Sequence, residues 1–425
     1  MTGELKKTAS MLALLAAAGV MVGGVAPKAA RAADLGGDCC ADLEDRVAEL
    51  EATAVKKGNK KVSLTITGRV SATVMAWSDG GNANGGGFDR NSDVYFGDVS
   101  GSGPRIILKG DAKVSSDLVA GYYIKLNAKF GEVTKNSQTT RQDSPTVKAA
   151  ETYVFLTSKA LGTLQLGNTL GSAYDAYTLN VNPAVMGGES AGRTKGDFFL
   201  RQASGLTAGT KYSSLLNSFE PAAENRLQYI SPVVGDWLKV EADVGGDDVY
   251  GLAAILDGKI KDTITVKAGI GYQSASRFDG NTGLHKQANA KDTANRLVAT
   301  AGISDVISGL FLQGNYAVAY NQGAVANHLQ DITFWKVDAG WSQNVTALGN
   351  TTLWAGYLEN KNVLQDGSKA TVIQVGIDQS LEDAGSNVYL TYEATSVDAI
   401  AAPISGSAFG SQTLSTLTGG MTIKF

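Results

Sequence analysis

The chain ends in TLTGGMTIKF (residues 416–425), in which apolar or small residues alternate with polar ones. An alternation of period two gives a strand one apolar and one polar face. Leu417, Met421 and Phe425 share the first face, and the threonines and a lysine occupy the second. The same pattern recurs in segment after segment back to Val62, so one sheet has to separate an apolar medium from water.

The composition limits what the two media are. The chain has 425 residues and is 43% hydrophobic, and its mean hydropathy of -0.05 is too low for a bundle of membrane helices. Its one long apolar run, Ala9 to Ala26, follows two lysines and precedes the small-residue site at 30–32, which is the layout of a secretory signal peptide. We therefore expect export and removal of residues 1–32. The remaining chain is more acidic than the whole, which argues against nucleic-acid binding.

A short helix is predicted inside the N-terminal segment 33–61, ahead of the first strand. Apolar residues recur at four-three-four spacing along residues 42–54, with charged residues between them. The seam consists of Leu43, Val47, Leu50 and Ala54. So short a helix is marginal alone in water. It either pairs with copies of itself as an oligomerising coil or packs as an amphipathic plug or spacer on the periplasmic side.

Residues 62–425 predict an all-β fold, a transmembrane antiparallel β-barrel of about 16 strands. Short and long connections alternate along the chain, as they would if all short ones lay at one rim; the short joint at 246–248 is the exception. Closure is required, because an open sheet edge in hydrocarbon leaves backbone groups unpaired. The strands are expected near residues 62–74, 105–114, 120–130, 147–158, 163–170, 224–231, 236–245, 249–257, 262–275, 294–304, 309–321, 332–343, 350–361, 370–380, 386–396 and 414–425.

The connection at 171–223 is far longer than its neighbours and is predicted to narrow the pore. A barrel of this size is too wide for its own side chains to fill. The acidic residues expected at the constriction are Asp175, Glu189 and Asp197, and the basic residues expected on the facing wall are Arg69, Arg105, Lys109, Lys125 and Arg226. The resulting transverse field would sort solutes by charge and size, with a preference for cations. Alternatively, the loop extends outward and its charges are solvated.

Several stretches resemble the trimeric general porins of alphaproteobacterial outer membranes. They are CCADLEDRVAELEAT (39–53), KVSLTITGRV (61–70), GNTLGSAYD (167–175), NRLQYISP (225–232) and GGMTIKF (419–425). The resemblance implies a homotrimer of 16-stranded barrels in the outer membrane of a Gram-negative bacterium, in contact with lipid and lipopolysaccharide. It also implies an inward-folded third outer loop, passive diffusion of ions and small hydrophilic solutes, and a terminal Phe425 recognised by the barrel-assembly machinery.

Enzymatic motifs are weak in this chain. Residues 188–192 match G-x-S-x-G but lack the strand before and the helix after that a nucleophile elbow needs. The two histidines, His285 and His328, lie in separate connections, so a histidine-dependent triad is not expected. Gly269-x-Gly271 lies within a strand and reads as a packing or lumen glycine pair. We expect a channel and no enzyme; the alternative is a surface-binding protein that the barrel anchors.

Metal sites and cofactors are not expected either. Cys39 and Cys40 are adjacent and precede the first strand, so they cannot link distant parts of the barrel, and no histidine lies nearby to complete a metal site. The acidic connections at 79–89 and 245–248 could hold Ca²⁺ but lack the order of an EF-hand loop. An N-terminal structural or interchain role remains for the cysteines.

Overall fold

The described residues all belong to one compact unit, Lys60–Phe425. The computed structural model describes residues 61–81, 90–98, 103–140, 145–187, 197–201, 207–212, 215–216, 223–246, 249–275, 294–320, 331–363, 366–398 and 412–425. The predicted signal peptide, the cysteines, the seam residues Leu43, Val47 and Leu50, the G-x-S-x-G stretch, both histidines and Glu189 lie outside these ranges. No helix within the described ranges is long and apolar enough to cross a membrane.

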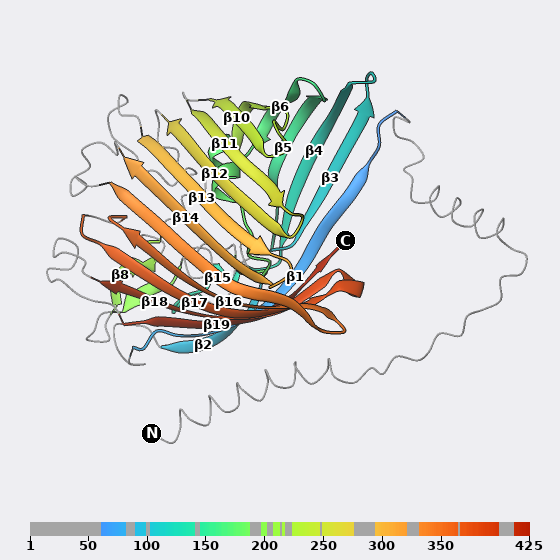
Figure 1. Cartoon of the computed structure of the whole chain (residues 1–425). Coiled ribbons are helices and arrows are strands. Elements are labelled where there is room, and N and C mark those ends of the chain that lie inside the picture. Colours follow the sequence, from blue (N-terminus) through green and yellow to red (C-terminus); the bar gives the residue numbers. More distant parts are fainter. Residues whose placement is uncertain are drawn as a thin grey trace, which may run out of the picture. The chain divides into compact units, whose positions relative to one another are not determined.

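Antiparallel strands form the barrel, and each pairs with the next along the chain (Figure 1). The barrel strands are β1 (Thr65–Ser78), β3 (Arg105–Lys113), β4 (Leu118–Lys129), β5 (Thr146–Ser158), β6 (Gly162–Thr169), β9 (Glu224–Ile230), β10 (Leu238–Gly245), β11 (Tyr250–Ile260), β12 (Ile264–Ala275), β13 (Ala294–Asp305), β14 (Leu310–Tyr320), β15 (Ile332–Thr346), β16 (Gly349–Lys361), β17 (Lys369–Leu381), β18 (Ser386–Asp398) and β19 (Leu414–Lys424).

The sheet closes where β1 pairs with β19, from Arg69 opposite Lys424 to Ser78 opposite Ser415. The first half of β1 also pairs with β3, and its second half pairs with a short extra strand, β2 (Ser92–Gly97). Because β2 and β3 share one edge of β1, the described residues give a ring of sixteen strand positions. The prediction of a closed antiparallel barrel is therefore confirmed. The sequence prediction treated residues 78–103 as a connection and missed β2, a strand of only 6 residues.

The lengths of the connections alternate as predicted. The turn at 115–117, like the later short turns, lies at the rim where β1 begins and β19 ends, and the long connections lie at the other rim. The joint at 246–248 is short in the structure too, since Val244 pairs with Tyr250 across it. Within its described residues, the long connection at 171–223 contains α3 (Ser172–Tyr177), β7 (Phe199–Arg201) and β8 (Thr207–Lys211).

The two faces of the sheet differ as the alternation predicts. On β19, Met421 and Ile423 are 38% and 45% exposed on the outer surface, whereas Thr418 and Thr422 are buried on the inner one. The buried apolar residues lie inside the barrel, where the long connection packs on the wall. The core of this molecule is thus in its lumen, and its outer surface is apolar, as a membrane protein requires.

Candidate pore constriction

The inner wall of the barrel has a dry half and a wet half. On β10 to β18 many inward side chains are buried, including charged ones such as Glu241 and Asp338, both 0% exposed. Lys239 on β10 and Asp257 on β11 are exceptions, at 34% and 53% exposed. On β3, β4 and β5 the inward side chains stay accessible: Lys109 is exposed, and Tyr123 and Tyr153 are half-buried. Water therefore has access to the wall formed by β3 to β6, and the long connection covers the opposite wall.

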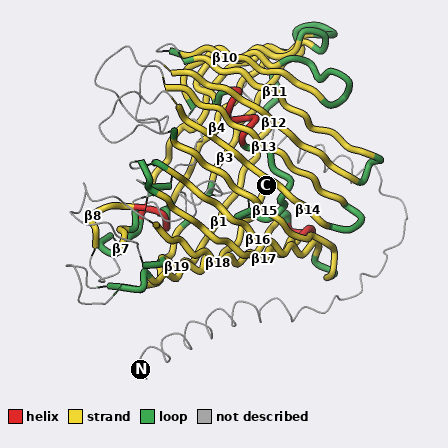
Figure 2. The backbone as a smooth tube through the Cα atoms, turned by 60° about the vertical axis from the view of Figure 1, so that its left-hand side comes forward, coloured by secondary structure: helices red, strands yellow, loops and turns green. Residues whose placement is uncertain are grey.

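Helix α3 packs on β11, β12 and β13 inside the barrel (the red segment beside β12 and β13 in Figure 2). A Cβ atom on Gly269 would lie 2.7 Å from the carbonyl oxygen of Ala176, and one on Gly271 would lie 2.8 Å from Cα of Ala173. These glycines on β12 leave a strip of bare backbone into which the helix fits. The interpretation of Gly269 and Gly271 as packing glycines is confirmed.

A buried carboxylate on β10 holds the N-terminus of α3. Asp243 Oδ2 accepts hydrogen bonds from Ser172 N (2.7 Å) and Ser172 Oγ (2.6 Å), and Asp243 Oδ1 accepts one from Arg226 Nη1 (2.6 Å). The side chains of Asp243 and Arg226 are both 0% exposed. A carboxylate at this end of a helix satisfies free backbone N–H groups, so wall and loop are joined by a charge-assisted network.

The segment after α3 is fixed to the wall through its backbone. Four side chains from β13, β14, β17 and β15 make these bonds: Thr300 Oγ1 donates to Tyr177 O (2.9 Å), Gln313 Oε1 accepts from Val181 N (2.7 Å), Asp378 Oδ2 accepts from Val185 N (2.9 Å) and Lys336 Nζ donates to Gly187 O (2.7 Å). Side chains on the wall thus replace the backbone partners that an irregular segment lacks.

The later part of the connection packs on β1. The rings of Phe198 and Trp77 meet edge to face at a centroid distance of 4.9 Å. Arg201 and Asp79, which are 0% and 1% exposed, form an ion pair of 2.7 Å. Met75 and Trp77 interrupt the polar inner face of β1, and they do so where the apolar side of the connection covers them.

The basic residues predicted to line the wall fall into two groups. Arg226 is buried and engaged with Asp243, Lys125 pairs with Glu151 at 2.8 Å, and Arg69 Nε donates to a backbone carbonyl. Lys109 and Arg105 lie on the inner face of β3 and form no ion pair with any carboxylate of the described residues. The assignment of these five side chains to a pore wall stays a prediction.

The predicted acidic residues also have partners. Burial, together with the neighbouring acid Glu241, raises the pKa of the Asp175 carboxyl in α3 well above its ordinary value. Asp197 pairs with Lys211 at 3.0 Å. Little unshielded negative charge therefore reaches the lumen from these two positions.

Aromatic residues on the wet wall were missed in the sequence. Tyr123 and Tyr153 stack at a centroid distance of 5.0 Å and an interplanar angle of 17°, and Lys109 Nζ lies 5.7 Å from the ring centre of Phe155. Strand parity could have found Tyr123, because it shares a face with Lys125. A β-bulge where β4 pairs with β5 shifts the register there, which parity does not foresee.

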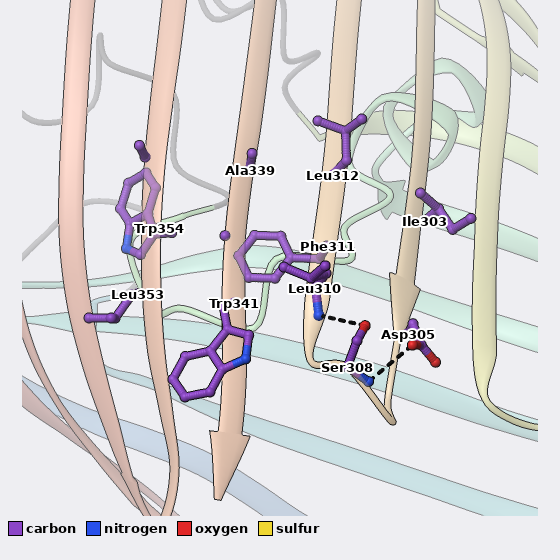
Figure 3. A pocket seen from close by; sticks show the side chains of 12 residues that line it. Ile303, Asp305, Ser308, Leu310, Phe311, Leu312, Ala339, Trp341, Leu353 and Trp354 are labelled. Atoms are coloured by element: carbon purple, nitrogen blue, oxygen red, sulfur yellow. Dashed lines mark hydrogen bonds between the residues drawn. The ribbon is translucent and has the colours of Figure 1, made fainter. Parts of the chain in front are cut away.

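An apolar groove of about 800 Å³ lies on the outer surface and is separate from the lumen (Figure 3). Leu310, Leu312 and Leu353, which are 60%, 52% and 48% exposed, line it. At its lower end, Asp305 Oδ2 accepts from Ser308 N at 3.0 Å and closes the turn. The groove faces the side that lipid contacts and takes no part in the pore.

Solved structures of outer-membrane channels share this fold. An anion-selective porin from Comamonas acidovorans is 16% identical with a TM-score of 0.54, and the match covers 86% of this chain and 100% of the other. The trimer form of OmpT from Vibrio cholerae is 13% identical with a TM-score of 0.52, covering 86% and 100%. OmpF of Salmonella typhi, in complex with daunomycin, is 14% identical with a TM-score of 0.52, covering 87% and 99%.

Sequence comparison assigns the family. A search of curated proteins gave no match. The family model described as "Gram-negative porin" matches residues 13–399. That match extends over most of the chain, and the closed barrel agrees with it: this protein belongs to the Gram-negative porin family.

Proposed function

We propose that this outer-membrane porin passes small hydrophilic solutes along the wall formed by β3 to β6, and that it prefers anions. Passive diffusion through the outer membrane is the activity of the family to which the chain belongs. The finer statements, on the route and the charge preference, are the proposal. The observation that carries them is the division of the inner wall into a dry half under the loop and a wet half opposite it.

The charges on the wet wall favour anions. Arg105 and Lys109 have no carboxylate partner among the described residues, whereas Lys125 and Lys239 are paired with Glu151 and Glu241. Unpaired charge in a narrow, low-dielectric passage sets the potential that a permeating ion meets. This placement reverses the cation preference expected from the acidic residues of the loop. The similar Comamonas acidovorans structure is described as anion-selective, which agrees with the proposal.

Assembly is part of the same proposal. Homotrimers are proposed because a similar structure is described as a trimer. The C-terminal Phe425 is exposed on the outer surface, and its backbone exchanges hydrogen bonds of 3.1 and 2.8 Å with Gly68 on β1. A terminal aromatic residue beside the strand pair that closes the barrel is available to the barrel-assembly machinery. Lipid and lipopolysaccharide are the proposed contacts of the apolar outer face.

Ion currents test the function. Purified protein added to a planar bilayer should give stepwise conductance, and a salt gradient should give a reversal potential of the sign for anions. Replacing both Arg105 and Lys109 with glutamine should move that potential toward the cation side. If the barrel shows no conductance, the alternative function, a barrel that anchors surface loops, would be supported. If the reversal potential does not respond to the two substitutions, the residues of β3 do not determine ion selectivity.

A further inference from the structure

The wet wall carries an aromatic surface beside unpaired cations, which a non-specific passage does not need. The strand register places Lys109, Tyr123 and Tyr153 in one row across β3, β4 and β5, and the next position in that row is Gly167 on β6. Since Gly167 has no side chain, β6 places no side chain beside Tyr153 in this row. The described residues provide no hydrogen-bond partner for either tyrosine hydroxyl.

The adjoining row adds a third ring. Phe155 lies across Gly121, where a Cβ atom would come within 2.3 Å of the ring. The ammonium group of Lys109 is 5.7 Å from the centre of that ring. The carboxylate two residues beyond Lys109, that of Asp111, is hydrogen-bonded to Ser63 at 2.9 Å. The cation at this position is therefore held over aromatic carbon, away from a carboxylate.

We propose that Tyr123, Tyr153 and Phe155, together with Arg105 and Lys109, form a binding subsite for planar aromatic carboxylates in the passage. A flat ring stacks on the tyrosine pair with a gain beyond simple burial of area. Its carboxylate accepts charge-assisted hydrogen bonds from the two free cations. An aliphatic carboxylate would use only the cations, and a neutral aromatic alcohol would use only the rings. The proposal deepens the proposed function, because it rests on the wet wall being the route.

Blocking of the channel by benzoate measures the subsite during conduction. Benzoate in the bath should interrupt the single-channel chloride current at lower concentration than cyclohexanecarboxylate or benzyl alcohol. Tyr153→Leu should weaken benzoate block about 2- to 10-fold, which is the worth of one aromatic pair. Lys109→Gln should weaken it about tenfold, the lower range for a hydrogen bond to a charged group. The matched control is Tyr122→Leu, because Tyr122 lies on the opposite, outer face of the same strand.

A binding measurement separates this subsite from the channel itself. The fluorine resonance of 4-fluorobenzoate should broaden with wild-type protein in detergent and with the Tyr122→Leu variant, and much less with Tyr153→Leu. Conductance without preference for benzoate over cyclohexanecarboxylate would overturn the subsite and leave the porin function in place. Broadening without any conductance would support the subsite and reject the proposed function. Equal broadening with Tyr153→Leu and with Tyr122→Leu would overturn the subsite whatever the currents show.

Discussion

Asp243 is expected to determine the width of the constriction although it does not face the passage. Replacing it with alanine removes the acceptor for Ser172 N, Ser172 Oγ and Arg226 Nη1, at 2.7, 2.6 and 2.6 Å. These bonds connect β10, β9 and α3. Their loss should release the start of the loop from the wall while the barrel strands stay paired.

The magnitude follows from burial and charge. A hydrogen bond to a charged group contributes about 1.5–3 kcal/mol, so the two bonds to Ser172 hold the helix end with at least about 3 kcal/mol. Every 1.4 kcal/mol is a factor of ten, and the ratio of detached to attached loop should therefore rise about 100-fold. The variant also removes the nearer of the two carboxylates that pair with the buried Arg226 guanidinium, Asp243 at 2.6 Å, and leaves Glu224 at 3.6 Å. Removing one partner of a buried ion pair costs about 3–5 kcal/mol in measured cases, and Glu224 should reduce that cost here.

The assay is single-channel conductance combined with swelling of liposomes in sugars of graded size. Asp243→Ala should show higher or fluctuating conductance and admit larger sugars. Asp257→Ala is the matched control: Asp257 is 53% exposed and pairs with Lys267 at 3.1 Å, and an exposed pair contributes only about 0–1 kcal/mol. The reasoning is refuted if both variants fold, as judged by circular dichroism, and share the size limit of the wild type.

Three further outcomes are expected. Burial and a neighbouring acid raise the pKa of Asp175, so its carboxyl becomes negatively charged only as the pH rises through that raised value. The anion preference of the channel should therefore weaken as the pH rises. In the Asp175→Asn variant, the reversal potential should lose this part of its pH dependence. Gly271→Val would force Cβ to within 2.8 Å of Ala173 Cα and should lower the temperature at which the barrel unfolds on gels by an amount equivalent to about 1–3 kcal/mol. Gly314→Val is the control and should differ little, because a Cβ atom there would make only an ordinary contact, 3.9 Å from the carbonyl oxygen of Lys336. Deleting residues 39–57 should make the trimer less resistant to heat and detergent, and an unchanged dissociation temperature would reduce this segment to a spacer.

The barrel could be predicted because each strand records both of its environments. Lipid on one side of the sheet, and water or the packed loop on the other, require apolar and polar side chains to alternate along each strand. Strands such as β19 can therefore be predicted from their own sequence. The strand β2 could not be predicted in this way, because its 6 residues are stabilised by pairing with β1 and do not carry a clear alternation of apolar and polar residues. Local sequence cannot reveal a strand whose stability comes from tertiary pairing.

The existence of a constriction could be predicted from the sequence, but which of its charged residues are paired could not. The length of the connection at 171–223 indicated a constriction, and the charges near it were visible. What the sequence does not contain is which of them meet. Arg226 on β9 pairs with Asp243 on the neighbouring strand β10, and Asp175 in α3 lies beside Glu241, which is far from it along the chain. Parity assigns a side chain to a face of the sheet but not to a partner, and the partner decides whether the charge acts on solutes.

The packed half of the lumen explains how a loop can act as a fixed filter. A segment held only by its two ends would fluctuate, and its charges would average over many positions. Here the backbone of the loop is bound by wall side chains such as Lys336 and Asp378, and bare glycines on β12 let α3 lie flush with the sheet. The buried charges serve this attachment, so they are unavailable to the solute. Ion selectivity therefore depends on the opposite wall, where Arg105 and Lys109 do not attach the loop. Substitutions of these two residues should change the ion preference without loosening the constriction.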